Sequence, residues 1–196
     1  MSRNLSALVI ALFLIPAATL TALAQDVWQI DPMHSSAQFS VRHLGISTVR
    51  GAFTKVSGTV LVDDANPAKD QITASIDAAS VDTRVEMRDN DLRSPNFFDV
   101  QKYPTITFKS KKIEPAGPGK LKVAGDLTIH GVTKEVVLDV DGPSPAIKDP
   151  WGNPRRGASA STKVIRQDFS VNGSPGVVGD EITINLDVEF IKPPAK

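Results

Sequence analysis

The ten residues Glu181–Phe190, EITINLDVEF, alternate strictly between polar and apolar side chains. Apolar residues occupy every even position from Ile182 to Phe190, and charged or polar residues fill the positions between them. Successive side chains of a β-strand point to opposite faces of a sheet, so a period of two predicts a strand with one buried and one solvated face. The stretch therefore indicates an antiparallel sheet around an apolar interior.

The same alternation recurs along most of the chain. It is clear in Gln71–Ala78 and Leu121–Ile129, and weaker in Ala37–His43, Phe53–Val62, Thr105–Ser110, Glu135–Val140 and Ala158–Val171. We therefore expect about eight strands, mostly antiparallel. The dipeptide His130-Gly131 predicts a tight hairpin, whereas Asp141–Gly157, rich in proline and glycine, predicts a long surface loop.

One segment departs from the β pattern. Thr83 and Glu86 have the spacing of a capping box, which satisfies two backbone amides at a helix start. Ser94-Pro95 supplies a second start signal, a capping hydroxyl ahead of a proline at the first helical position. We expect one or two short helices within residues 83–100. The pattern as a whole predicts a mainly β protein, an eight-stranded antiparallel β-barrel with a short helical insertion that plugs it.

The first residues have the pattern of a secretory signal peptide. Arg3 precedes the apolar run Ala7–Ile15, Pro16 breaks that run, and Ala22-Leu23-Ala24 matches the small-x-small cleavage pattern. The run is too short for a bilayer span of about 20 residues, which disfavours the alternative of an uncleaved anchor. We expect residues 1–24 to be removed, and residues 25–196 to form one domain with no stable membrane span.

Composition narrows the class of protein. The 196 residues carry 22 basic and 22 acidic side chains without a basic cluster, which argues against nucleic acid as a partner. The chain has no cysteine, so an exported form relies on its core rather than on disulfides. The bacterial periplasm is the predicted localisation.

The buried faces of the predicted strands carry small or β-branched residues and few aromatics. The set is Gly58, Val60, Ala74, Ala78, Val123, Gly125 and Val188, while aromatics make up 6% of the chain. Eight strands of this length enclose a bore on the order of 25 Å long, which suits a chain-shaped ligand. The alternative is that the small residues interdigitate into a solid core.

Several longer motifs point to a known family. They are His34–Gly45 (HSSAQFSVRHLG), Val49–Phe53 (VRGAF), Ser80–Arg84 (SVDTR), Leu92–Val100 (LRSPNFFDV), Lys102–Pro104 (KYP), Leu127–Lys134 (LTIHGVTK) and Arg166–Phe169 (RQDF). In this order they cover roughly residues 26–192, and the chain resembles the YceI family. Two positions depart from its pattern: Glu135 stands where proline often occurs, and Ser170 where glycine often occurs.

The resemblance implies an extended, lipocalin-like barrel in the bacterial periplasm, often a homodimer. It also implies a non-covalently bound polyisoprenoid chain or similar long amphiphile, such as an isoprenoid quinone or a fatty-acid derivative. We therefore expect a lipid-binding or carrier protein, not an enzyme, and no cofactor. Two alternatives stay open, a lipid-modifying enzyme that acts inside the barrel and a solid-core, stress-protective structural protein.

The expected ligand-binding residues form a wall and a mouth. The wall set is Phe39, Val41, His43, Ile76, Phe97, Phe98, Leu127, Ile129, Ile184, Leu186 and Val188. At the mouth, the guanidinium groups of Arg42, Arg50 and Arg84 would hydrogen-bond an anionic head group. The alternative for these arginines is ordinary surface pairing with Glu86, Asp89, Asp91 or Asp99.

Sites of other kinds find little support. His34, His43 and His130 lack the spacing of zinc ligands, so structural roles are expected and no metal site. Asp89-Asn90-Asp91 resembles the start of a calcium loop, but Ser94 and Val100 stand where such a loop needs glycine and glutamate. The Gly-x-Ser-x-Gly motif of a nucleophile elbow does not occur, so no catalytic residue is expected.

Overall fold

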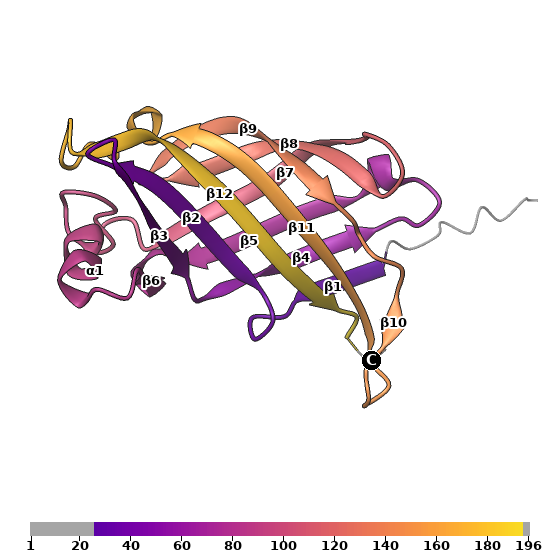
Figure 1. The fold of residues 1–196 in the computed structure, drawn as a ribbon. Coiled ribbons are helices and arrows are strands. Elements are labelled where there is room, and N and C mark those ends of the chain that lie inside the picture. The colour runs from indigo at the N-terminus through magenta and orange to yellow at the C-terminus, as the bar shows by residue number, and fades with distance from the viewer. Residues whose placement is uncertain (1–25, 194–196) are drawn as a thin grey trace, which may run out of the picture.

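The computed structural model describes residues 26–193, and in it eight strands close into an antiparallel barrel. In order around the ring these are β1 (Asp26–Ile30), β4 (Val56–Val62), β5 (Gln71–Asp77), β7 (Thr105–Pro115), β8 (Lys120–Ile129), β9 (Val132–Asp141), β11 (Pro154–Ile165) and β12 (Val178–Ile191). Pairing of β12 with both β11 and β1 closes the ring. The predicted eight-stranded antiparallel barrel is confirmed (Figure 1). The expected signal peptide lies outside the described residues.

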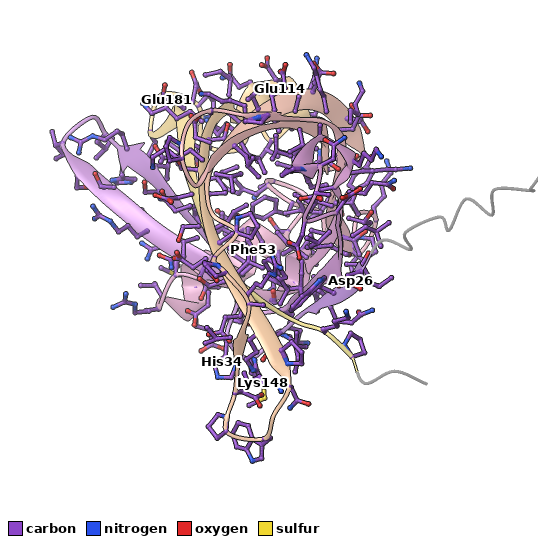
Figure 2. The ribbon with its side chains drawn as sticks, turned by 90° about the vertical axis from the view of Figure 1, so that its right-hand side faces the viewer. Asp26, His34, Phe53, Glu114, Lys148 and Glu181 are labelled. Carbon is purple, nitrogen blue, oxygen red and sulfur yellow. The ribbon has the colours of Figure 1, made fainter. Side chains whose placement is uncertain are left out.

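One edge of β12 pairs with two different strands. β12 pairs with β1 at Gln29↔Ile191 and Ile30↔Phe190, and then along Val178–Asp187 with β2 (Ser36–His43). β2 pairs with β3 (Ser47–Phe53), and the two form a hairpin that leans away from the barrel (Figure 2). Two short strands, β6 (Val81–Asp82) and β10 (Ile147–Lys148), extend the sheet at its edges.

The helical insertion contains one α-helix, α1 (Glu86–Arg93). The predicted capping box is wrong, because the Thr83 hydroxyl and N–H donate to Asp89 Oδ1 at 2.5 and 2.9 Å, and the residue before the helix is Val85. Ser94-Pro95 begins turns instead of a second α-helix. Three short 3-10 helices lie elsewhere: η1 (Pro67–Lys69), η2 (Ala78–Ser80) and η3 (Arg166–Phe169).

Several strand boundaries differ from the predicted ones. The stretch Phe53–Val62 is divided between β3 and β4, because the chain turns at Thr54 and Lys55. The stretch Ala158–Val171 leaves the sheet after Ile165 and continues as η3. The predicted loop Asp141–Gly157 contains β10 and the first residues of β11. The predicted hairpin is confirmed, and His130 and Gly131 take positive φ angles of 51° and 75° at its tip.

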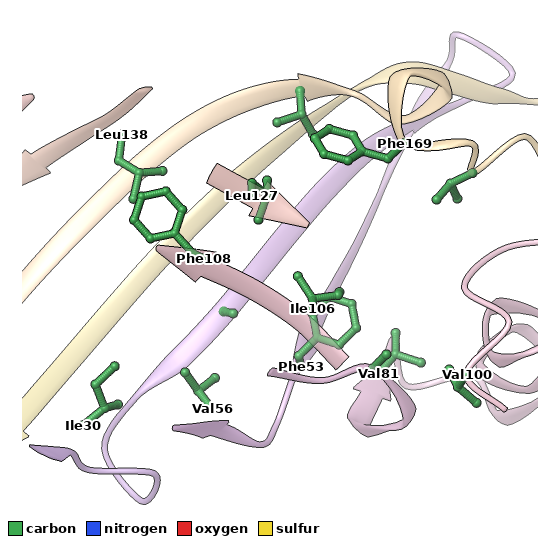
Figure 3. Packing of buried hydrophobic residues seen from close by; sticks show 14 of the residues in the cluster. Ile30, Phe53, Val56, Val81, Val100, Ile106, Phe108, Leu127, Leu138 and Phe169 are labelled. Carbon is green, nitrogen blue, oxygen red and sulfur yellow. The ribbon is translucent and has the colours of Figure 1, made fainter. Parts of the chain in front are cut away.

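The core extends through the barrel interior, from Ile30 and Leu138 to Val100 of the helical insertion (Figure 3). Val81 and Val123 are fully buried, and Phe97 and Val100 of the insertion join them in the same cluster. The Phe53 and Phe98 rings meet edge to face at 5.5 Å between centroids, which ties the insertion to β3. Each such side chain contributes about 1.5–3 kcal/mol by leaving water. The insertion is therefore an integral plug, not a loose appendage.

Candidate binding cavity

An apolar cavity of about 260 Å³ lies inside the barrel. Every barrel strand contributes to its lining: Ile30, Val60, Ile72, Phe108, Val123, Leu138, Ala160 and Ile184 represent the eight, and Leu92, Phe97 and Phe98 come from the plug. The cavity is therefore narrow and elongated, because this modest volume is lined by residues from all along the strands. Such a space accommodates a chain better than a compact molecule.

Ten residues of the predicted wall line this cavity. They are Phe39, Val41, Ile76, Phe97, Phe98, Leu127, Ile129, Ile184, Leu186 and Val188. Those on strands share the parity of their strand's inward face, which is why the alternation in the sequence placed them correctly. Their contact with a ligand stays a prediction.

Four predicted residues lie outside the cavity lining. Arg42 is exposed and donates to the Thr48 hydroxyl at 2.8 Å and to the Gly45 carbonyl at 2.7 Å, which fixes it within its own hairpin. Arg50 is exposed opposite Ser40, and Arg84 is exposed beside Asp82 at a φ of 65°. His43 keeps inward parity, but it stands at the last position of β2, opposite Val178, and does not line the cavity. The structure therefore does not bring these four residues to the cavity.

Some glycines on the strands make room for aromatic rings and do not widen the cavity. A Cβ added to Gly125 would lie 2.5 Å from Cζ of Phe108, and one added to Gly51 would lie 2.5 Å from Cζ of Phe39. The rings thus occupy space that the glycines leave open. The cavity is narrower than the residue composition of the strands implies.

Sequence reasoning missed the polar residues of the cavity. Asp70 and Arg166 belong to its lining, along with Ser36, Gln38, Thr107 and Thr162. Arg166 is buried and donates to the carbonyls of Val171, Gly173, Val178 and Gly179. Its guanidinium is thereby committed to holding η3 against the start of β12. Asp70, which follows the Pro67–Lys69 turn, has the same parity as Ile72, Ala74 and Ile76 of β5, so the alternation extended by two residues would have placed it inward.

A second apolar cluster lies toward the end of the barrel opposite the plug. Trp28 packs edge to face on Phe190 at 5.8 Å, together with Val62. The Arg156 guanidinium lies 5.2 Å from the centre of the Trp28 ring and donates to both carboxylate oxygens of Asp64 at 2.7 and 2.8 Å. The cation over an aromatic face and its ion pair stabilise this cluster.

An ion-pair network surrounds Arg155 at the same end, where Figure 2 labels His34 and Lys148. Arg155 donates to Asp31 at 2.5 Å, to Asp149 at 3.0 Å and to Glu189 at 3.1 Å. The hydrogen bonds from Arg155 and His34 hold the pKa of Asp31 well below its usual range. Burial opposes the ionisation of Asp149, but hydrogen bonds from Arg155 and Asn153 lower its pKa to about 2. The network fixes the loop that carries β10 against the barrel.

The same network contains the one group of potential metal ligands found among residues 26–193. Ligand atoms of Asp31, His34 and Glu189 lie within 4.8 Å of one another. Arg155 already donates to both carboxylates, so its guanidinium supplies the positive charge that a metal ion would bring. A second histidine, His130, packs its ring against that of Tyr103 at 4.5 Å between centroids. These contacts support structural roles for His34 and His130.

Within residues 26–193, no helix has both the length and the apolar character needed to cross a bilayer.

Known proteins share this fold and much of the sequence. The chain matches the YceI-like domain family over residues 28–190. Protein YceI of Escherichia coli O157:H7 is 35% identical over 194 residues, covering 98% of this chain and 99% of that protein. The Campylobacter jejuni YCEI crystal structure superposes with a TM-score of 0.68 at 36% identity, covering 78% of this chain and 90% of that one. A polyisoprenoid binding domain from Saccharophagus degradans shares the fold, with a TM-score of 0.66 at 16% identity, covering 86% and 99%. The chain belongs to the YceI-like domain family.

Proposed function

We propose that this protein binds and carries a long-chain lipid of the polyisoprenoid type in the bacterial periplasm. The observation that carries the proposal is the narrow apolar cavity that runs inside a barrel with a helical plug at one end. Each methylene that leaves water for such a wall contributes about 0.8 kcal/mol, so affinity grows with chain length. An isoprenoid quinone or a polyprenyl chain meets this requirement.

Two further observations support the proposal. One structural neighbour is described as a polyisoprenoid binding domain, although its identity of 16% ties it to this chain by fold alone. The signal-peptide pattern of residues 1–24 supports export. We also propose a homodimer, as expected from the sequence resemblance, with one lipid in each barrel.

The polar residues at the cavity favour binding over catalysis. Arg166 is held by backbone carbonyls, and the histidines that the sequence offers do not line the cavity. A lipid-modifying enzyme would need a general base in contact with the chain, and Asp70 is the only carboxylate among the described lining residues. We therefore propose a carrier, not an enzyme.

Native mass spectrometry tests this function on protein prepared without detergent, before and after extraction with organic solvent. The proposal predicts an adduct of lipid mass that solvent removes, and that an added long-chain polyprenol restores at one molecule per barrel. Protein mass alone, with no uptake of polyprenol, would support the solid-core alternative. Chemical change of the added polyprenol during incubation would support the enzyme.

A further inference from the structure

The hairpin of β2 and β3 ends in an exposed apolar turn. Ile46 is 80% exposed and Leu44 is 54% exposed, although both side chains are large and hydrophobic. The N–H of Leu44 donates to the carbonyl of Val177 at 2.8 Å, which places the exposed Val177 beside the turn. Figure 1 shows the turn at the end of the molecule that carries α1, and Figure 2 shows the hairpin standing out from the barrel. Leu44, Ile46 and Val177 therefore form a protruding patch, which we call the apolar tip.

The hairpin holds this turn in a defined shape. Leu44 and Gly45 take positive φ angles of 51° and 68°, which reverse the chain into β3. The Arg42 guanidinium donates to the Gly45 carbonyl at 2.7 Å and to the Thr48 hydroxyl at 2.8 Å, across the base of the turn. The apolar side chains are thus presented on an ordered turn, and binding does not have to order it first.

The hairpin is positively charged. Residues 32–62, which include β2, β3 and their turn, contain no aspartate or glutamate. Arg42 and Arg50 are exposed on the outer face of the hairpin. The adjoining part of β12 carries Asp180, which pairs with Arg166 at 3.4 Å. The side chains around the apolar tip therefore favour an anionic surface.

The helical insertion at the same end carries charges of both signs. Within residues 82–93 these are Asp82, Arg84, Glu86, Arg88, Asp89, Asp91 and Arg93. The insertion meets the hairpin at its base, where β6 pairs with Ala52 and Phe53. The charges of the insertion therefore lie beside the base of the hairpin, and the arginines of β2 and β3 determine the charge nearer the tip.

A second set of exposed apolar side chains lies at the opposite end of the barrel. Trp151 is 81% exposed and Ile147 is 65% exposed, in the loop that the Arg155 network holds. Three carboxylates surround that one guanidinium, those of Asp31, Asp149 and Glu189. An anionic surface would therefore be received less well at this end than at the hairpin.

The apolar tip adjoins the cavity and has a shape that suits a bilayer. Val178 follows Val177, pairs with His43 and lines the cavity, as does Val41 on β2. The tip is a small protrusion, and three side chains cannot bury the area of about 1,000 Å² that a stable protein interface needs. A bilayer surface requires no matching shape, and it takes up apolar side chains that have basic neighbours.

We propose that the apolar tip docks this protein on a membrane surface that contains anionic phospholipid. Leu44, Ile46 and Val177 enter the interfacial region of the bilayer, and Arg42 and Arg50 pair with lipid phosphate groups. The protein then lies on the membrane without crossing it, with the cavity wall at Val178 close to the lipid. The docking goes beyond the proposed function, whereas its use for lipid transfer rests on that function.

Flotation of the full mature protein with lipid vesicles tests the docking. We expect the protein to float with mixed vesicles of phosphatidylcholine and phosphatidylglycerol, and more weakly with vesicles of phosphatidylcholine alone. Ile46→Ser should lower the partition into mixed vesicles by about tenfold, because it removes much of the inserted apolar surface. Ile147→Ser is the matched control, since it makes the same change at an exposed isoleucine of the opposite end, and it should leave the partition unchanged.

Arg50→Gln tests the part played by charge. It should lower the partition into mixed vesicles by about fivefold and leave the partition into phosphatidylcholine vesicles unchanged. Lys148→Gln is the matched control, because this lysine is exposed at the opposite end and has no ion-pair partner among residues 26–193. An equal loss of partition in both variants would show that net charge, and not the hairpin, directs the binding, which would overturn the docking site.

The fluorescence of the wild type gives a readout that needs no variant. The chain has two tryptophans, the buried Trp28 and the exposed Trp151. Docking through the apolar tip should leave the Trp151 emission unchanged when mixed vesicles are added. A shift of that emission to shorter wavelength would mean that the opposite end enters the bilayer, and would overturn the proposal.

The remaining outcomes separate the docking from the proposed function. A wild type that floats with neither kind of vesicle but takes up a long-chain polyprenol would overturn the docking and leave the carrier function standing. Flotation without polyprenol uptake would support the docking and overturn the carrier function. If Ile46→Ser alters the oligomeric state in sedimentation velocity and leaves flotation unchanged, the tip contacts a second copy of the chain and the proposal fails.

Discussion

The ring of Phe108 lies over Gly125 on the neighbouring strand, and this pair narrows the middle of the cavity. A Cβ on Gly125 would lie 2.5 Å from Cζ of Phe108 and 2.6 Å from the backbone oxygen of Lys109. Both distances are shorter than van der Waals contact. The Phe108 ring therefore occupies the space that a side chain at position 125 would need.

Gly125→Ala is expected to lower the free energy of unfolding by about 1–3 kcal/mol, because the strands and the Phe108 ring must move apart. Thermal melting followed by circular dichroism measures this effect as a loss of several degrees. Gly157→Ala is the matched control on β11, where the added Cβ meets only the Val188 oxygen at 3.7 Å. Equal melting temperatures for Gly125→Ala and the wild type would show that packing of the Phe108 ring does not require glycine at position 125.

Ser170 ends η3 with a φ of 59°, in the left-handed region that favours glycine. Ser170→Gly should therefore stabilise the fold by about 0.5–1 kcal/mol, through relief of a conformation that costs a non-glycine residue about 1–2 kcal/mol. Urea unfolding gives the difference. Ser161→Gly in the middle of β11 is the control and should destabilise, since glycine weakens a strand interior. Loss of stability in Ser170→Gly would contradict this interpretation.

The Arg155 network predicts a dependence of stability on pH. The pKa of Asp31 is lower in the folded protein than in the unfolded chain, so its ionised form contributes stability that is fully present above about pH 4. That contribution disappears as the pH falls from about 4 through the pKa of Asp31 in the folded protein. The contribution of Asp149, whose pKa in the folded protein is about 2, is lost in the same way. Asp31→Asn should cost on the order of 2–3 kcal/mol at pH 7 and progressively less below pH 4.

Chemical denaturation at several pH values checks the prediction for Asp31. Asp139→Asn serves as the control, because an exposed ion pair contributes about 0–1 kcal/mol. A difference between wild type and Asp31→Asn that stays constant from pH 7 to pH 2 would mean that Arg155 does not stabilise the ionised carboxylate.

Export predicts a defined mature terminus. Full-length protein expressed in a Gram-negative host should be released by osmotic shock and should begin at Gln25, since cleavage after Ala24 fits the small-x-small pattern. N-terminal sequencing of the released fraction gives the answer. Recovery of most of the protein with Met1 or Ser2 at its terminus would contradict export.

The barrel and the inward residues could be predicted because each depends on local periodicity. Leu127, Ile129, Ile184, Leu186 and Val188 line the cavity as their parity requires. Shorter elements carried too little signal: β1 has five residues and β10 has two, so neither was anticipated. The capping box failed because Asp89, one turn into the helix, competes for the Thr83 hydroxyl.

The polar contacts could not be predicted, since they depend on distant parts of the chain. Arg155 and Asp31 are 124 positions apart, and closure of the ring by β1 and β12 brings them together. Asp70 is an exception, because it shares the parity of Ile72 and Ile76, and the alternation of β5 extended to it gives the inward face. The mouth arginines were predicted from their charge and from their positions beside a turn or in the helical insertion, and neither specifies the direction of a side chain.

Val188→Trp tests the central claim that the interior is a lipid-binding cavity. Val188 lies on β12 and lines the space, so an indole there should fill part of the bore. The cavity should absorb much of the added volume, whereas a solid core would lose about 1–3 kcal/mol to overpacking. Asn185→Trp, on the exposed face of the same strand, is the matched control.

The decisive measurement is the uptake of a long-chain polyprenol by Val188→Trp, determined together with its melting temperature. The account predicts that uptake is lost in this variant while its melting temperature stays close to that of the wild type, and that Asn185→Trp keeps both. Unchanged uptake in Val188→Trp with a melting temperature several degrees lower would contradict a lipid-filled interior.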